Sequence, residues 1–112
     1  MNTNLKTRIQ VLGDPSRLAI FERLAAGPLA VVDIARDLPI TRPAVSQHLK
    51  VLKDAGLVTV ERAANRRIYR LDTGGVAGLR DYFDQFWRDS LQAFKQAAEK
   101  SFKEKTDEPG RD

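Results

Sequence analysis

The sequence predicts a mainly α-helical fold with one small β-hairpin, because the spacing of its apolar residues changes along the chain. Apolar residues recur every three or four positions up to residue 56 and again after residue 75, as on amphipathic helices. Between these regions, the segments LVTVER from Leu57 and RRIYRL from Arg66 are rich in residues that favour strands. A length of 112 residues fits one domain, expected over 1–104, and the absence of cysteine excludes a disulfide framework.

Two helices are expected over 4–26. The first carries apolar residues at helical spacing, which are Leu5, Ile9 and Leu12. Asp14 is a good N-cap for the second helix, and Pro15 fits its first turn, where a missing N–H does no harm. The second helix is expected to bury Leu18, Phe21, Leu24 and Ala25. Gly27 then ends this helix.

A helix-turn-helix is expected over 30–56. The inward residues of its first helix are Val31, Ile34, Ala35 and Leu38. Pro39 disfavours helical geometry at the residue before it, so the chain turns within a few residues into the second helix. There Thr41 is placed to cap the N–H of Ala44, and Gly56 supplies the left-handed residue that ends the helix.

The helix that follows Thr41 has two unlike faces. At about 100° per residue, Val45, Leu49 and Leu52 fall within a narrow arc that suits the core. The opposite side is small, polar and basic, and consists of Pro43, Ser46, Gln47, Lys50 and Lys53. A solvated surface alone could have this composition. Its position after a tight helix-helix turn favours an interpretation as the helix that enters the major groove of DNA.

A β-hairpin is expected over 57–72, with a short connection at residues 63–65. Asn65 is the residue expected to take a positive φ there. The tip carries Arg66 and Arg67, with Arg62 nearby, and a hairpin that directly follows a helix-turn-helix is a wing. These arginines can reach a phosphate or an adjacent minor groove, although they would also keep an edge hairpin in solution.

Positive charge is concentrated in the same region. Between Arg36 and Arg70 there are eight basic and three acidic residues, a balance of +5, whereas the whole chain carries +4 and the remainder therefore −1. This distribution is typical of a nucleic-acid contact surface. Charge alone would also fit an acidic protein partner or an anionic membrane surface.

The longest helix is expected over 76–104, after a hinge at residues 72–75. It carries an apolar stripe at spacings of three and four, formed by Leu79, Phe83, Phe86, Trp87, Leu91, Phe94, Ala98 and Phe102. Such a stripe on a long terminal helix favours core packing and a subunit interface over a ligand pocket. Residues 105–112 are charged and contain Pro and Gly, so we expect disorder there. No signal peptide or membrane-spanning segment is visible, so we expect a cytoplasmic protein.

Three segments together resemble the ArsR family of bacterial winged-helix repressors. They are LGDPSRLAIFERLAAGPLAVVDIA from Leu12, RPAVSQHLKVLKDAGLV from Arg42 and RRIYRL from Arg66. The resemblance covers residues 12–71 closely and extends loosely into the terminal helix. It implies a homodimer with its first and last helices at the interface, bound to double-stranded DNA at an operator of dyad symmetry. It also implies repression of transcription until a signal releases the protein.

The chain departs from the metal-sensing members of that family. Their pattern ELCVCDL would fall on PLAVVDI from Pro28, which puts Ala30 and Val32 where thiolates would be. The terminal helix contains no histidine for the family's other metal site. We therefore expect no metal and no cofactor, and the effector is left open. The sequence also resembles a branch of the family that does not sense metals, whose genes often lie beside genes for SRPBCC-type proteins.

These observations assign candidate residues to three roles. The base-reading residues are Arg42, Pro43, Ser46 and Gln47. The residues assigned to phosphates or to the wing are Thr41, His48, Lys50, Lys53, Arg62, Asn65, Arg66 and Arg67. The residues assigned to the dimer interface are Leu5, Ile9, Leu79, Phe83, Phe86, Trp87, Leu91 and Phe94. His48 is expected to be half-buried at the margin of the core face, with a hydrogen bond to backbone or phosphate.

The predicted function is a sequence-specific DNA-binding transcription regulator that forms a homodimer and acts as a repressor. An enzyme is not expected, because the chain has no cysteine nucleophile, no second histidine and no glycine-rich phosphate loop. Two alternatives are open. One is a winged helix that binds an acidic protein partner, and the other is a metal-responsive repressor with oxygen and nitrogen ligands.

Overall fold

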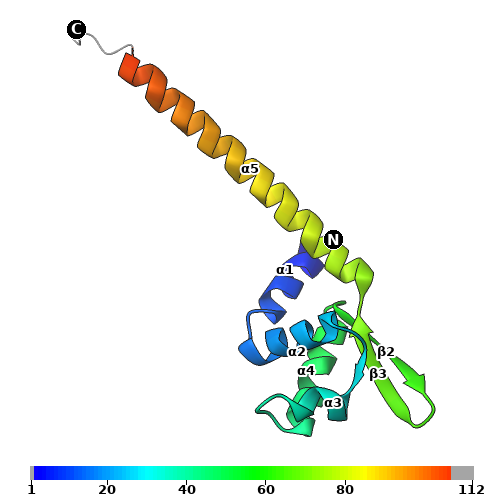
Figure 1. Cartoon of the computed structure of the whole chain (residues 1–112). Coiled ribbons are helices and arrows are strands. Elements are labelled where there is room, and N and C mark those ends of the chain that lie inside the picture. The colour runs from blue at the N-terminus through cyan, green and yellow to red at the C-terminus, as the bar shows by residue number, and fades with distance from the viewer. Residues whose placement is uncertain (1, 107–112) are drawn as a thin grey trace. The chain divides into compact units, whose positions relative to one another are not determined.

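The computed structural model describes residues 2–106, with side chains for 5–105. The elements are α1 (Asn2–Val11), α2 (Pro15–Ala25), β1 (Leu29–Ala30), α3 (Val31–Arg36), α4 (Arg42–Asp54), β2 (Val58–Ala63), β3 (Arg66–Leu71) and α5 (Thr73–Thr106), as Figure 1 shows. The chain divides into two compact units, one up to Leu79 and one from Arg80 on. The predicted class, mainly helical with a small β-hairpin, is confirmed.

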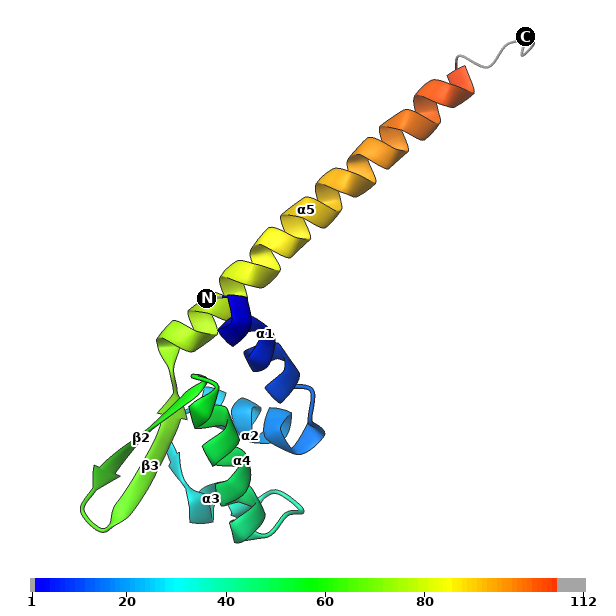
Figure 2. The same ribbon diagram turned by 180° about the vertical axis from the view of Figure 1, so that it is seen from behind.

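The first unit has a core formed by helices α1–α4, the sheet and the first turns of α5. The side chains that are less than 2% exposed are those of Ile20, Ile34, Val45, Leu49, Leu52, Leu57 and Val58. Figures 1 and 2, which show opposite sides, place α2, α3 and α4 together and show the β2–β3 hairpin extending away from them. In this core, the second helix of the helix-turn-helix, α4, packs against α1, α2, α3 and β2, while the tip of the hairpin is left outside.

The buried stripe of α2 differs from the predicted one. Leu18 is 40% exposed and Ala25 is exposed, whereas Ile20 and Leu24 are buried. Ile20 and Leu24 are four residues apart and so lie on one face, and Leu18 lies about 200° from Ile20 around the helix. The prediction for Leu18 and Ala25 was wrong because α2 packs against both α4 and β3, and these neighbours select the Ile20 side.

The sheet has a third strand that the sequence did not predict. Its order is β1-β3-β2 and all pairings are antiparallel, with Leu29 opposite Tyr69 and Ala30 opposite Ile68. A strand of two residues is too short to produce a periodic pattern. β2 and β3 pair along their whole length, from Val58 opposite Leu71 to the last pair at the hairpin tip.

The hairpin loop also corrects a prediction. The positive φ lies on Ala64, at 57°, and not on Asn65. In this two-residue loop the register places Ala64 first, and a positive φ at the first loop position but not at the second is the pattern of a type II′ turn. The position of Ala64 in the turn therefore decides where the positive φ lies, and the preference of asparagine for positive φ does not.

The predicted hinge before the last helix is instead the start of that helix. α5 begins at Thr73, and the carboxylate of Asp72 accepts hydrogen bonds from the N–H groups of Gly74 (3.0 Å) and Gly75 (3.2 Å). Capping by an aspartate offsets the low helix propensity of the two glycines. The helix also reaches Thr106, so residues 105 and 106 are helical and were wrongly assigned to the tail; residues 107–112 lie outside the described residues.

Across residues 2–106, no helix is both long enough and apolar enough to span a membrane.

Candidate nucleic-acid interface

Both ends of α4 have the local structure that the sequence predicted. Oγ1 of Thr41 accepts the N–H of Ala44 at 3.3 Å. At the other end, Gly56 has φ 81°, its N–H donates to the carbonyl of Lys53 at 2.9 Å, and the N–H of Leu57 donates to the carbonyl of Leu52 at 2.9 Å. These two bonds form a Schellman motif, so the length of α4 is determined by the residues at its own ends.

The C-terminal end of α4 is also held by α1 and α5. Nε of Arg8 donates to the carbonyl oxygen of Ala55 at 3.1 Å, which satisfies one of the last carbonyl groups of the helix. The first turn of α5 approaches so closely that a Cβ on Gly75 would overlap the carbonyl oxygen of Gly56. These contacts fix the C-terminal end of α4 against α1 and the first turn of α5.

The two faces of α4 are segregated as predicted. Val45, Leu49 and Leu52 are fully buried. The exposed residues at its N-terminus and along its other side are Thr41, Arg42, Pro43, Ser46, Gln47, Lys50, Val51, Lys53 and Asp54. His48 has intermediate exposure, as expected for the margin between the faces. All four residues assigned to base reading therefore lie on exposed surface in the N-terminal half of one helix.

The wing brings its arginines together at the tip of the hairpin. Arg62 lies opposite Arg67 in the β2–β3 register, and Arg66 lies opposite Ala63. Arg62, Asn65, Arg66 and Arg67 are exposed, and together with Ala64 they line a hollow of about 280 Å³. Three guanidinium groups within a few residues give the end of the wing a positive charge, and guanidinium groups are suited to contacts with anions.

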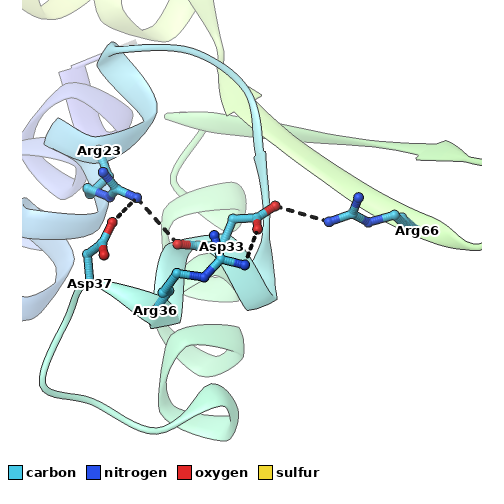
Figure 3. Close-up of polar contacts among 5 residues, drawn as sticks. All are labelled: Arg23, Asp33, Arg36, Asp37 and Arg66. Carbon is cyan, nitrogen blue, oxygen red and sulfur yellow. Dashed lines mark hydrogen bonds and ion pairs between the residues drawn. The ribbon is translucent and has the colours of Figure 1, made fainter.

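Some of the cations assigned to phosphates are paired with carboxylates. Nζ of Lys50 lies 3.0 Å from Asp54, and Nη2 of Arg66 lies 3.0 Å from Asp33 on α3. Asp33 also pairs with Arg36, as Figure 3 shows. Sequence reasoning did not single out Asp33 or Arg36. Their i, i+3 spacing was visible, but nothing local indicates a contact with Arg66, which is 33 residues away in the chain.

The pKa of Asp14, the N-cap of α2, is shifted in the folded protein. Its pKa lies below the ordinary value of 3.8, first because the backbone N–H of Arg17 donates to its carboxylate at 3.0 Å. The charge of Arg17, the N–H of Ser16 and the charge of His48 add to this lowering, while partial desolvation opposes it.

The residues assigned to the dimer interface fall into two groups. Leu79 is buried in the core of its own chain, and Leu5 and Ile9 are partly buried against that core. On α5 the exposed fractions range from 48% for Leu91 to 74% for Phe94, and the other exposed members are Phe83, Phe86 and Trp87. This group, which we call the aromatic stripe, is an apolar surface of the second unit.

The described residues contain no group of three or more His, Cys, Asp or Glu side chains that could hold a metal ion.

Known proteins share both the sequence and the fold. Residues 12–61 match a family model described as a helix-turn-helix domain. The HTH-type transcriptional regulator Rv2034 of Mycobacterium tuberculosis is 58% identical over 87 residues, which are 78% of this chain and 81% of that protein. The arsenical resistance operon repressor of Staphylococcus xylosus is 38% identical over 68 residues, which are 61% of this chain and 65% of that repressor.

A solved structure supports the family at the level of the fold. The homodimeric winged helix-turn-helix DNA-binding domain of Mb0332 from Mycobacterium bovis, described as a possible ArsR-family regulator, superposes with a TM-score of 0.64 and 28% identity. The match covers 81% of this chain and 84% of that domain. With α3 and α4 as the helix-turn-helix and β2–β3 as the wing, the chain belongs to the ArsR family of winged helix-turn-helix transcriptional regulators.

Proposed function

We propose that the protein is a homodimeric repressor that binds an operator of dyad symmetry through α4 and the wing. The observation that carries this proposal is the division of α4 into one fully buried face and one exposed face that is mostly polar and basic, with Val51 as its apolar member. A helix that exposes Arg42, Ser46 and Gln47 near its N-terminus and lysines further along can enter the major groove with its N-terminal end towards the bases.

The exposed residues divide by position into those assigned to base contacts and those assigned to phosphate contacts. Arg42, Ser46 and Gln47 lie in the N-terminal half of α4, and Arg and Gln offer the paired hydrogen bonds that recognise guanine and adenine. Phosphates are assigned to Lys50 and Lys53 on α4, and to the wing arginines at positions 62, 66 and 67. The exposed ion pair between Lys50 and Asp54 is a weak obstacle, because such pairs contribute about 0–1 kcal/mol.

The aromatic stripe supports dimer formation. In a single chain it exposes Phe83, Phe86, Trp87, Leu91 and Phe94, and each large apolar side chain gains about 1.5–3 kcal/mol when it is buried. The Mb0332 domain is described as homodimeric, and the relative from Staphylococcus xylosus is named a repressor. A dimer would present two copies of α4 to two half-sites, which matches a dyad-symmetric operator.

Salt distinguishes this function from that of a protein-interaction module. If α4 and the wing neutralise several phosphates, the affinity for duplex DNA falls by orders of magnitude between low and physiological salt, and a preference for one sequence persists. The measurement is a fluorescence-anisotropy titration against mixed-sequence duplex pools at several salt concentrations. Binding that is absent at low salt, or that shows no sequence preference at any salt, would contradict the proposal.

A further inference from the structure

Asp33 lies between two arginines that come from different elements. Its Oδ1 is 3.0 Å from Nη2 of Arg36, one turn along α3, and its Oδ2 is 3.0 Å from Nη2 of Arg66, at the start of β3 (Figure 3). The two carboxylate oxygens thus each bind a different guanidinium group. One acidic residue joins the first helix of the helix-turn-helix to the wing.

The ion pair between Asp33 and Arg66 lies just beyond the part of β3 that pairs with β1. β1 pairs with β3 only at Tyr69 and Ile68, so the part of β3 that begins at Arg66 has no strand partner on that side. The last residue of β1, Ala30, pairs with Ile68 of β3. The ion pair of Arg66 with Asp33 contacts β3 two residues before Ile68, on the side of the hairpin tip. It therefore adds a contact between α3 and the wing beyond the strand pairing.

The geometry leaves both arginines able to bind an anion. The side chain of Asp33 is 26% exposed, whereas those of Arg66 and Arg36 are 55% and 66% exposed. Each arginine contacts Asp33 through Nη2, and the other guanidinium nitrogens of both form no hydrogen bond with any residue that the structure describes. A guanidinium group has five N–H donors, so several are left for phosphate oxygens.

We propose that Asp33 is a positioning residue that holds Arg36 and Arg66 as a two-arginine clip for one DNA phosphate between α3 and the wing. The clip rests on the proposed function, and it adds Arg36 to the DNA-binding residues. The clip also reverses the effect on DNA affinity that the negative charge of Asp33 alone would predict. An acidic side chain near DNA should weaken binding, whereas this one strengthens binding because it fixes two cations in place.

The C-cap residue of α3 provides a matched control. Asp37 follows Asp33 by one turn and forms an ion pair with Arg23 of α2 at 2.7 Å, away from the wing (Figure 3). Asp33→Asn and Asp37→Asn remove the same charge from neighbouring positions. Only the first substitution breaks the link between α3 and β3.

The test measures the affinity of the full-length chain for a duplex of about 30 base pairs, or about three helical turns, at several salt concentrations. The variants are Asp33→Asn, Asp37→Asn, Arg66→Ala and the double variant Asp33→Asn/Arg66→Ala. We expect Asp33→Asn to bind about tenfold more weakly and to lower the salt slope by about two per dimer. Asp37→Asn should bind as the wild type does or slightly more tightly, and the double variant should be no weaker than Arg66→Ala.

Tighter binding by Asp33→Asn, equal to that of Asp37→Asn, would overturn the clip. If circular dichroism shows that Asp33→Asn is unfolded, Arg36→Ala takes its place, because Arg36 is exposed on α3 and its removal should leave the fold intact. Arg36→Ala must then lower the salt slope by about two per dimer, and an unchanged slope would overturn the clip. A wild type that does not bind duplex DNA would instead refute the proposed function itself.

Discussion

At the scale of single residues, Gly75 has the strictest steric requirement. It is buried in the first turn of α5, and a Cβ at this position would overlap the carbonyl oxygen of Gly56 at the end of α4. Neither backbone can give way easily, because Asp72 caps one helix and Gly56 ends the other. A methyl group here must therefore displace the start of α5 or the end of α4.

Gly75→Ala is expected to lower the free energy of unfolding by about 1–3 kcal/mol, the usual cost of overpacking. Gly74→Ala is the matched control, since its Cβ would lie 3.4 Å from Oδ1 of Asp72, an ordinary contact, and alanine favours the helix. Urea denaturation monitored by circular dichroism measures both. Equal stabilities of the two variants would show that the junction is looser than described.

Residue identities were predicted well where their environment is local. Thr41 was assigned as the cap for the N–H of Ala44, which it accepts, and Asp14 was assigned as the cap of the helix that starts at Pro15 and accepts the N–H of Arg17. The role of Gly75 was missed because its partner lies 19 positions back along the chain and is brought close only by the packing of α4 against α5. Asp33 was missed for the same reason, since Arg66 reaches it only through the sheet.

At the scale of elements, the start of α2 links stability to pH. The pKa of Asp14 is lowered in the folded protein, mainly by the N–H of Arg17, so its carboxylate stabilises the fold above its unfolded-state pKa of about 3.8. As the pH falls, the unfolded chain takes up the proton first. The stabilisation is then lost progressively until the folded carboxylate is protonated too.

The comparison with Asp14→Asn isolates this effect, because asparagine is also a good N-cap but does not titrate. We expect the difference in unfolding free energy between the wild type and Asp14→Asn to be constant above about pH 5 and to shrink in favour of the variant below it. Urea denaturation at a series of pH values gives the difference directly. A difference that is constant down to pH 2 would exclude a lowered pKa for Asp14.

Whole elements were predictable to different degrees. α4 was predicted to within a residue because its cap, its Schellman end and its two faces are all written in one stretch of sequence. β1 could not be predicted, because two residues acquire strand geometry only by pairing with Tyr69 and Ile68. The start of α5 was placed three residues late, because two glycines suggested a hinge and the capping bonds of Asp72 were not considered.

At the scale of the whole molecule, the aromatic stripe makes a prediction about assembly. Replacing Phe83 and Trp87 by serine should give monomers whose first unit remains folded, because both side chains are more than half exposed in a single chain. Sedimentation velocity at micromolar concentration measures the mass, and circular dichroism measures the fold. Gln85→Ser, on the same helix but about 200° away from Phe83, should remain dimeric. Dimeric double variants, or a monomeric wild type, would contradict the proposed interface.

The composition also makes a prediction about the signal. Zinc, cadmium, nickel and arsenite at micromolar concentration should leave the affinity for DNA unchanged, because the chain has no cysteine and one histidine. Titration calorimetry with each ion, followed by a DNA-binding measurement with the ion present, makes the comparison. Stoichiometric metal binding that is coupled to release of DNA would refute the prediction and favour a metal-responsive repressor.

The central claim is that the exposed face of α4 reads DNA sequence, and selection of bound duplexes from random DNA tests it most directly. The wild type should yield a consensus of dyad symmetry. Gln47→Ala and Arg42→Ala should each bind that consensus about 1–3 kcal/mol more weakly and lose the preference at one position of each half-site. Lys50→Ala should keep the whole consensus and bind all sequences more weakly. If Gln47→Ala and Arg42→Ala select the same sequences in the same order as the wild type, α4 does not read DNA.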